Sequence, residues 1–90
     1  MENGPNIPAD RLEAMVREHL RQRRLPVVTN PYVKAGYGGV GAVCEVCGLE
    51  IQKHDAEYAV PNVNGHPFIF HLRCHHAWQA ECARVQAQGQ

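Results

Sequence analysis

The chain has 90 residues, with nine Lys plus Arg and nine Asp plus Glu, so its formal charge is zero. A chain of this length forms one domain at most and buries only about 60–65% of its unfolded surface, so a small core needs added stabilisation. The balanced charge lacks the strongly basic footprint of a typical nucleic-acid-binding domain. No apolar run approaches the ~18 residues of a membrane-spanning helix, and the N-terminus lacks the features of a signal peptide. We therefore expect a cytoplasmic protein without membrane contact.

The first predicted element is an amphipathic helix over residues 10–24, after a loose polar tail at residues 1–7. Asp10 is the expected N-cap, because Glu13 three residues later completes a capping-box-like pattern. Pro26 ends the helix. The predicted apolar stripe must be covered by the rest of the chain, by a second copy or by a partner, and it consists of Leu12, Met15, Val16 and Leu20.

A short basic run lies at the C-terminal end of this helix and contains Arg21, Arg23 and Arg24. Cations at this end offset the helix dipole, and such a run is typical of a solvated helix face. The alternative is a patch that contacts the phosphates of a nucleic acid. In that case further contacts would come from Lys34, Lys53 and Arg73.

Residues 26–43 are predicted to form a Gly- and Pro-rich linker that separates residues 1–25 from a module at residues 44–88. Pro31 and four glycines favour a loop. The segment Gly36–Gly41 formally matches the G-x-G-x-x-G pattern, but a dinucleotide site needs a strand before this pattern and a helix after it. Here a Cys-x-x-Cys turn follows, so a flexible linker is the interpretation. In the alternative, the loop lies across the domain and is held by Tyr32 or Tyr37.

The module at residues 44–88 is predicted to contain a Cys-x-x-Cys turn, a β-hairpin and a final helix. Residues 57–63 form the first strand, which Pro61 places at a sheet edge or a bulge. Asn64-Gly65 is a hairpin-turn signal, and residues 66–70 form the return strand. The final helix begins at about Leu72 and carries an apolar stripe made of Cys74, Trp78, Cys82 and Val85.

Four residues of this module have the spacing of ligands for one zinc ion. A Cys-x-x-Cys turn brings two thiolates to one ion, and Gly48 supplies the positive φ that such a turn favours. The His-x-x-Cys spacing brings two further ligands to one side of a first helical turn. Four protein ligands fill a tetrahedral shell, so the zinc is expected to be structural. The predicted ligands are Cys44, Cys47, His71 and Cys74.

The other cysteine and histidines are expected to lie outside the metal site. Cys82 lies eight residues past Cys74, which is about 12 Å along a continuous helix, so it is interpreted as a core thiol. The remaining histidines of this module are expected to be solvated, or on the surface or half-buried: His54, His66, His75 and His76. Two alternatives stay open. One of the two histidines after Cys74 could replace His71 as the ligand, or the cysteines could be unmetallated core or disulfide residues.

With these ligands the module resembles a treble-clef zinc finger, in which a zinc knuckle, a β-hairpin and a helix follow in this order. The ligand set also resembles the first zinc module of a LIM domain, although no second Cys/His set follows at LIM spacing. A closer resemblance, over most of residues 8–82, is to small uncharacterised bacterial proteins. It is carried by Glu45-Val46-Cys47-Gly48, by Phe70-His71-Leu72-Arg73-Cys74 and by Trp78-Gln79. The resemblance implies a small α+β zinc-binding fold, and it implies no activity.

The leading functional hypothesis is a non-enzymatic module that binds a protein partner, or a second copy through the N-terminal helix. Trp78 is interpreted as a cap on the core against Phe68 or Phe70, and as a partner hot spot in the alternative. Nucleic-acid binding by the basic residues is the alternative function. Catalysis and a small-molecule substrate are not expected, because no paired carboxylates and no Ser/His/Asp set are visible. The predicted partner-binding residues are Leu12, Met15, Val16, Leu20, Arg21, Arg23, Arg24 and Trp78.

Overall fold

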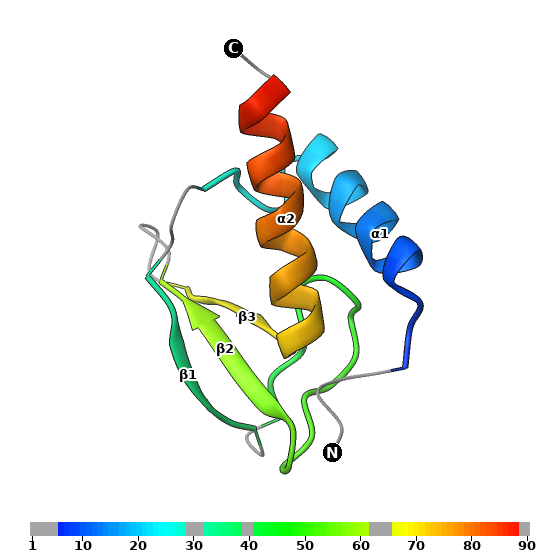
Figure 1. Ribbon diagram of the computed structural model, residues 1–90. Helices are drawn as coiled ribbons and strands as arrows, with labels where there is room; N and C mark the ends of the chain where they lie inside the picture. Colours follow the sequence, from blue (N-terminus) through cyan, green and yellow to red (C-terminus); the bar gives the residue numbers. More distant parts are fainter. Residues whose placement is uncertain (1–5, 29–31, 39–40, 62–65, 89–90) are drawn as a thin grey trace.

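The computed structural model describes residues 6–28, 32–38, 41–61 and 66–88, and it has two helices and three strands in this part of the chain (Figure 1). In chain order they are α1 (Ala9–Arg21), β1 (Lys34–Tyr37), β2 (Ala56–Val60), β3 (Phe68–Phe70) and α2 (Leu72–Gln88). The strands form one antiparallel sheet in the order β1-β2-β3. Helix α2 packs against the sheet on one side and against α1 on the other. The protein is therefore a small α+β domain, as predicted.

Helix α1 begins one residue earlier than predicted, and the expected cap is wrong. The N-cap is Pro8, whose carbonyl accepts hydrogen bonds from the backbone N–H groups of Arg11 and Leu12, both at 3.1 Å. Asp10 lies inside the first turn, where its Oδ1 accepts a hydrogen bond from the Arg11 N–H at 3.0 Å. A carboxylate in this turn still favours the helix, because it faces the positive end of the helix dipole.

The C-terminal end of α1 is a Schellman turn that stops the helix at Arg21, earlier than the predicted end at residue 24. The N–H of Arg23 donates to the Leu20 carbonyl at 3.1 Å, and the N–H of Arg24 donates to the His19 carbonyl at 2.9 Å. Arg23 has a φ of 61°, which is the left-handed conformation that this turn requires and that glycine usually supplies. An arginine therefore occupies a position that strains its backbone.

The apolar stripe of α1 is covered by the chain itself. The side chains of Leu12 and Val16 are 2% and 0% exposed, and Met15 and Leu20 are half-buried against the same core. Helix α1 lies alongside α2, which supplies this cover (Figure 1). The prediction that the stripe binds a partner or a second copy is therefore wrong for Leu12 and Val16, because their apolar surface is already removed from solvent.

Strand β1 replaces part of the predicted linker. Residues Lys34–Tyr37 pair antiparallel with β2, and the register continues to Gly38, whose N–H donates to the Asp55 carbonyl at 3.1 Å. A Cβ atom on Gly38 would clash with the Gln52 carbonyl oxygen, so this glycine permits a close approach between two segments. The loop prediction failed here because a glycine needed for packing was interpreted as a sign of flexibility. The alternative prediction had Tyr32 or Tyr37 holding the loop against the domain. These two side chains are 71% and 80% exposed.

Strands β2 and β3 form the predicted pairing, and each is shorter than predicted. Strand β2 ends at Val60, directly before Pro61, which has no N–H to donate to a neighbouring strand. The predicted Asn64-Gly65 turn lies outside the described residues.

The centre of the core is an aromatic stack between β3 and α2. The rings of Phe70 and Trp78 have centroids 5.0 Å apart and an interplanar angle of 18°. Trp78 is 0% exposed, and its Nε1–H donates to the Pro26 carbonyl at 2.9 Å. The interpretation of Trp78 as a core residue is confirmed, and its alternative role as a partner hot spot is wrong, because the side chain has no exposed surface. Neither helix in the described part of the chain could span a membrane.

Candidate metal centre

The four predicted ligands come together between the Cys-x-x-Cys turn and the start of α2. Their ligand atoms, three Sγ atoms and one imidazole nitrogen, all lie within 4.8 Å of one another. Three of the side chains are buried and Cys47 is half-buried. This arrangement can hold a metal ion, and it consists of Cys44, Cys47, His71 and Cys74.

The Cys-x-x-Cys turn, which we call the knuckle (residues 44–48), is shaped by its backbone. The Gly48 N–H donates to the Cys44 carbonyl at 3.0 Å, and the Cys44 N–H donates to the Leu49 carbonyl at 3.0 Å. Gly48 has a φ of 77°, so the expected need for a glycine at this position is confirmed. The turn brings the Cys44 and Cys47 thiols into the same cluster because the chain reverses within four residues.

The other two ligands flank the first residues of α2. The His71 carbonyl accepts a hydrogen bond from the His75 N–H at 2.9 Å, so His71 stands at the start of the helix and Cys74 lies in its first turn. Thiolates at a helix N-terminus are favoured by the helix dipole. The helix start therefore places both ligands on the side of the knuckle.

Two further contacts fix the knuckle on the domain. The N–H of Glu45 donates to the Ile69 carbonyl in β3 at 2.9 Å. From α1, the His19 Nε2 atom lies 3.0 Å from the Val46 carbonyl oxygen. A carbonyl oxygen can only accept, so His19 carries its proton on Nε2. The knuckle is thus held by α1 and by β3 at once.

The three thiols of the cluster shift one another's pKa because they lie close together. Hydrogen bonds from the Cys47 and Cys74 thiols lower the pKa of Cys44. The hydrogen bond to Cys44 raises the pKa of Cys47 and that of Cys74, and burial adds to both shifts. The close packing of the three thiols therefore disfavours the ionisation of Cys47 and Cys74 beside Cys44. A divalent cation would remove the repulsion and favour the thiolate form of all three.

Asp55 lies behind the histidine ligand and was not found by the sequence reasoning. The His71 Nδ1 atom lies 3.4 Å from the Cys47 Sγ atom, so Nδ1 faces the cluster. The opposite ring nitrogen, Nε2, lies 3.9 Å from Oδ2 of Asp55, which is 5% exposed. This carboxylate also accepts a hydrogen bond from the Gln52 N–H at 3.1 Å. A carboxylate behind a metal-binding histidine favours the tautomer whose cluster-facing nitrogen is free to bind a metal.

Cys82 lies outside the cluster, as predicted. It is 1% exposed, and its Sγ atom lies 3.7 Å from the Pro26 carbonyl oxygen. Burial raises the pKa of the Cys82 thiol. A buried neutral thiol has low reactivity, so the interpretation of Cys82 as a core residue is confirmed.

The prediction for His75 is wrong. This residue was interpreted as a surface or half-buried residue, but it is only 4% exposed and its ring is stacked on Tyr58 with centroids 5.4 Å apart. It also contacts Phe70 and Trp78, because it lies on the face of α2 that is covered by the sheet. Burial lowers the pKa of His75, since a charged imidazole loses its hydration there. The predictions of exposure hold for the histidines His54, His66 and His76.

The basic run at the end of α1 is exposed, and two of its three arginines have partners. The Arg21 guanidinium forms an ion pair with Glu18 at 2.6 Å, which lowers the pKa of that carboxylate. The Arg24 guanidinium donates to the Gln22 side chain. The other predicted phosphate contacts lie on separate segments, and they are Lys34, Lys53 and Arg73.

Comparisons of the chain with protein-family models, with curated proteins and with solved structures found no match. The class of protein is therefore defined by its own fold and site. It is a small α+β domain with two helices, a three-stranded antiparallel sheet and a buried Cys/His cluster that can hold a metal ion.

Proposed function

We propose that this protein is a non-enzymatic interaction module, stabilised by one structural zinc ion in a treble-clef-like fold, that binds a protein partner. The observation that carries the proposal is the closed cluster of three thiols and one imidazole within 4.8 Å. Soft sulfur ligands with one imidazole in a tetrahedral set favour zinc. Four protein ligands leave no coordination position for a substrate or a reactive water, so the metal supports the fold rather than chemistry.

The proposed partner surface lies on the sheet side of the domain, because α2 covers the apolar stripe of α1. Tyr37 is 80% exposed on β1, and Tyr32 just before that strand is 71% exposed. On the knuckle side, Val43 and Leu49 are 53% and 50% exposed. Exposed tyrosines and apolar side chains supply much of the binding energy of protein interfaces. Val43 and Leu49 directly flank the knuckle, so the metal would help to hold these two side chains in place.

The test is affinity capture from the native host with the zinc-loaded protein, followed by identification of the captured proteins. We expect Tyr37→Ser to lose the specific partner while the zinc content and the melting temperature stay those of the wild type. The matched control is Val85→Ser, which removes an apolar side chain that is 38% exposed on α2. Equal capture by both variants and the wild type would contradict the proposed surface. The exchange of Leu12 and Leu20 for Ser is not a clean test, because it would disturb the core.

Nucleic-acid binding stays the alternative hypothesis. The observation in its favour is Arg23, which is exposed and forms no ion pair with the described residues. Such binding should weaken steeply with salt, because bound phosphates release their counterions. A gel shift at low salt that disappears in Arg23→Glu and at high salt would favour this alternative over the protein partner.

A further inference from the structure

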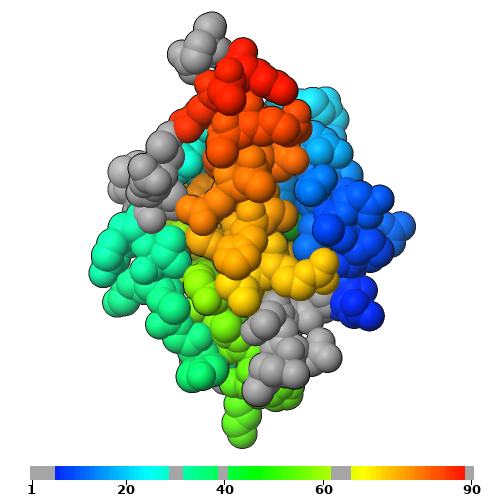
Figure 2. Space-filling view, viewed as in Figure 1, coloured from blue at the N-terminus to red at the C-terminus, as the bar shows by residue number. Residues whose placement is uncertain are grey.

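Strand β1 is an edge strand, and no other strand among the described residues pairs with its outer side. All four residues of the strand are exposed, and Figure 2 shows this segment at the margin of the molecule. The Gly38 N–H donates to the Asp55 carbonyl, in register with the pairing of β1 and β2. In an antiparallel ladder, residues that bond inward alternate with residues that bond outward. Gly36 therefore bonds toward β2, whereas Ala35 and Tyr37 direct their N–H and C=O groups outward.

We propose that two copies of this chain pair along their β1 strands, antiparallel and across a two-fold axis at Gly36. In this register Ala35 lies opposite Tyr37 of the second copy, and the reverse pair follows by symmetry. The two pairs exchange four backbone hydrogen bonds and join the two sheets into one of six strands. The inference rests on the proposed function as an interaction module, of which it names one partner.

The side chains of β1 complement their own copies in this register. Gly36 faces Gly36 of the second copy, and a Cβ atom at this position would meet nothing within 4 Å in its own chain. The large side chain of Tyr37 lies beside the small side chain of Ala35, once on each side of the axis. Lys34 lies opposite Gly38, so the two lysines do not face each other. An isologous interface requires a surface that matches itself in this way.

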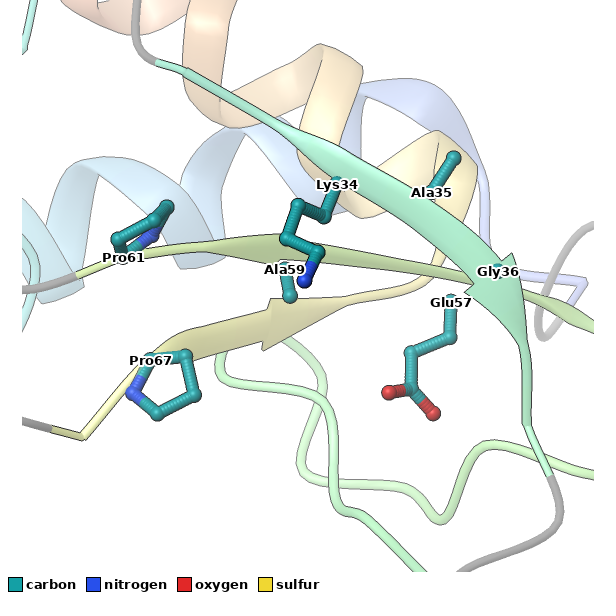
Figure 3. A pocket seen from close by; sticks show the side chains of 7 residues that line it. All are labelled: Lys34, Ala35, Gly36, Glu57, Ala59, Pro61 and Pro67. Atoms are coloured by element: carbon teal, nitrogen blue, oxygen red, sulfur yellow. The ribbon is translucent and has the colours of Figure 1, made fainter.

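Charge on the outer face of the sheet also favours a second copy. A groove of about 420 Å³ lies along this face, and Figure 3 shows Lys34 and Glu57 among its lining residues. The Oε1 atom of Glu57 is buried without a hydrogen-bond partner among the described residues, and Lys34 has no ion pair there.

A second copy would bring its own lysine to this carboxylate. Lys34 of the second copy would lie about 12 Å from Glu57 between Cα atoms, within the combined reach of the two side chains. Gly36 and Gly38 leave the path between them free of side chains. With one zinc ion and three thiolates the formal charge is about −1, so the net repulsion between two copies is small.

A cross-linking experiment on the zinc-loaded full chain tests the register. In Gly36→Cys the two new cysteines would form a non-hydrogen-bonded pair with Cα atoms about 4.5 Å apart, within the range that a disulfide spans. We expect a covalent dimer on a non-reducing gel after mild oxidation. In the matched control Lys34→Cys, the same residues of the two copies lie about 13 Å apart and cannot be joined. Cross-linking of Gly36→Cys no faster than that of the control would overturn the proposal.

Sedimentation of the zinc-loaded protein tests the pairing itself. The wild type should sediment as a dimer and Ala35→Pro as a monomer, because proline removes an outward N–H while the inward bonds to β2 remain. Ala35→Ser keeps the N–H and should remain a dimer. Equal zinc content in all three proteins shows that the fold is intact. A wild type that is monomeric at millimolar concentration overturns the self-pairing. If that monomer still captures a protein partner, the proposed function as an interaction module remains supported.

Discussion

Asp55 stands directly behind His71, with its Oδ2 atom 3.9 Å from Nε2 of the imidazole, and both side chains are almost fully buried. The carboxylate belongs to the turn before β2, whereas the histidine precedes α2. The two residues are therefore brought together by the packing of the hairpin against the helix. The pair orients the ring so that Nδ1 points at the thiols of the cluster.

The exchange Asp55→Asn should weaken metal retention roughly 10- to 100-fold, because the ring loses the charge that favours its metal-binding tautomer. The amide oxygen can still accept the hydrogen bond from the Gln52 N–H, so the turn keeps its support. Competition with a chromophoric zinc chelator measures the affinity. Glu50→Gln is the control, since it neutralises an exposed carboxylate next to the knuckle. An affinity of Asp55→Asn within twofold of the control value would show that the carboxylate has no effect on the metal.

Two cysteine variants distinguish the candidate metal ligand Cys74 from the core residue Cys82. Cys74→Ser should fail to retain one zinc per chain, because a buried hydroxyl is a poor zinc ligand and one corner of the cluster is lost. Cys82→Ser should keep the zinc and lower the free energy of unfolding by about 1–2 kcal/mol, the cost of burying a hydroxyl with an imperfect partner. Metal analysis after gel filtration and urea unfolding measure both quantities. Zinc loss in Cys82→Ser with retention in Cys74→Ser would reverse the assignment.

Removal of the metal should unfold the domain, both with a chelator and in mild acid. All three thiols must be thiolates to hold zinc, so binding lowers their pKa in the folded state below the value of about 8.5 in the unfolded chain. A group whose pKa is lowered by folding contributes stability that is lost as the pH falls. Trp78 is the only tryptophan of the chain and is fully buried, so a red shift of its emission reports the unfolding. An unchanged emission and melting temperature after complete zinc removal would contradict the structural role of the metal.

Arg23→Gly should stabilise the protein by about 0.5–1 kcal/mol. The residue has a φ of 61°, where a side chain costs about 1–2 kcal/mol and glycine costs little, although glycine also adds entropy to the unfolded chain. Urea unfolding measures the change. The matched control is Arg24→Gly, which has no positive φ to relieve and should destabilise instead. Equal effects of the two variants would show that the Schellman turn stores no strain at Arg23.

Glu81 is expected to stabilise the packing of α1 against α2 through an ion pair. Its buried carboxylate pairs with Arg17 of α1 at 3.2 Å and with Arg84 of α2 at 2.5 Å. A double-mutant cycle of Arg17→Gln and Glu81→Gln should give a coupling energy of about 1–2 kcal/mol, because the carboxylate is desolvated. A cycle on the exposed pair Glu18 and Arg21 is the comparison and should give no measurable coupling at physiological salt. Equal coupling in both cycles would mean that burial adds nothing to the contact.

The elements that were predicted correctly are those whose formation depends on residues close to one another in the sequence. The hairpin pairing follows from local alternation, and the knuckle from a glycine with positive φ at Gly48. The helix start at Leu72 agrees with the prediction from the periodic stripe whose first residue is Cys74. Strand β1 was missed because its signal is not local. The segment is rich in glycine, and Lys34–Tyr37 form a strand only because their backbone pairs with β2. The pairing also requires Gly38, which lies close to the turn at Gln52.

The sequence by itself predicted the four residues of the cluster that can hold a metal ion, because the spacing within each pair of them is set by a single turn of backbone. It also determined that Cys82 lies in the core, since a continuous helix separates it from Cys74. Only the tertiary structure decided which surfaces are exposed. In the folded protein, His75 and the apolar stripe of α1 are buried, Asp55 lies behind His71, and the residues of β1 are exposed. These outcomes depend on which segments pack together across the domain, and no local pattern of residues encodes that choice.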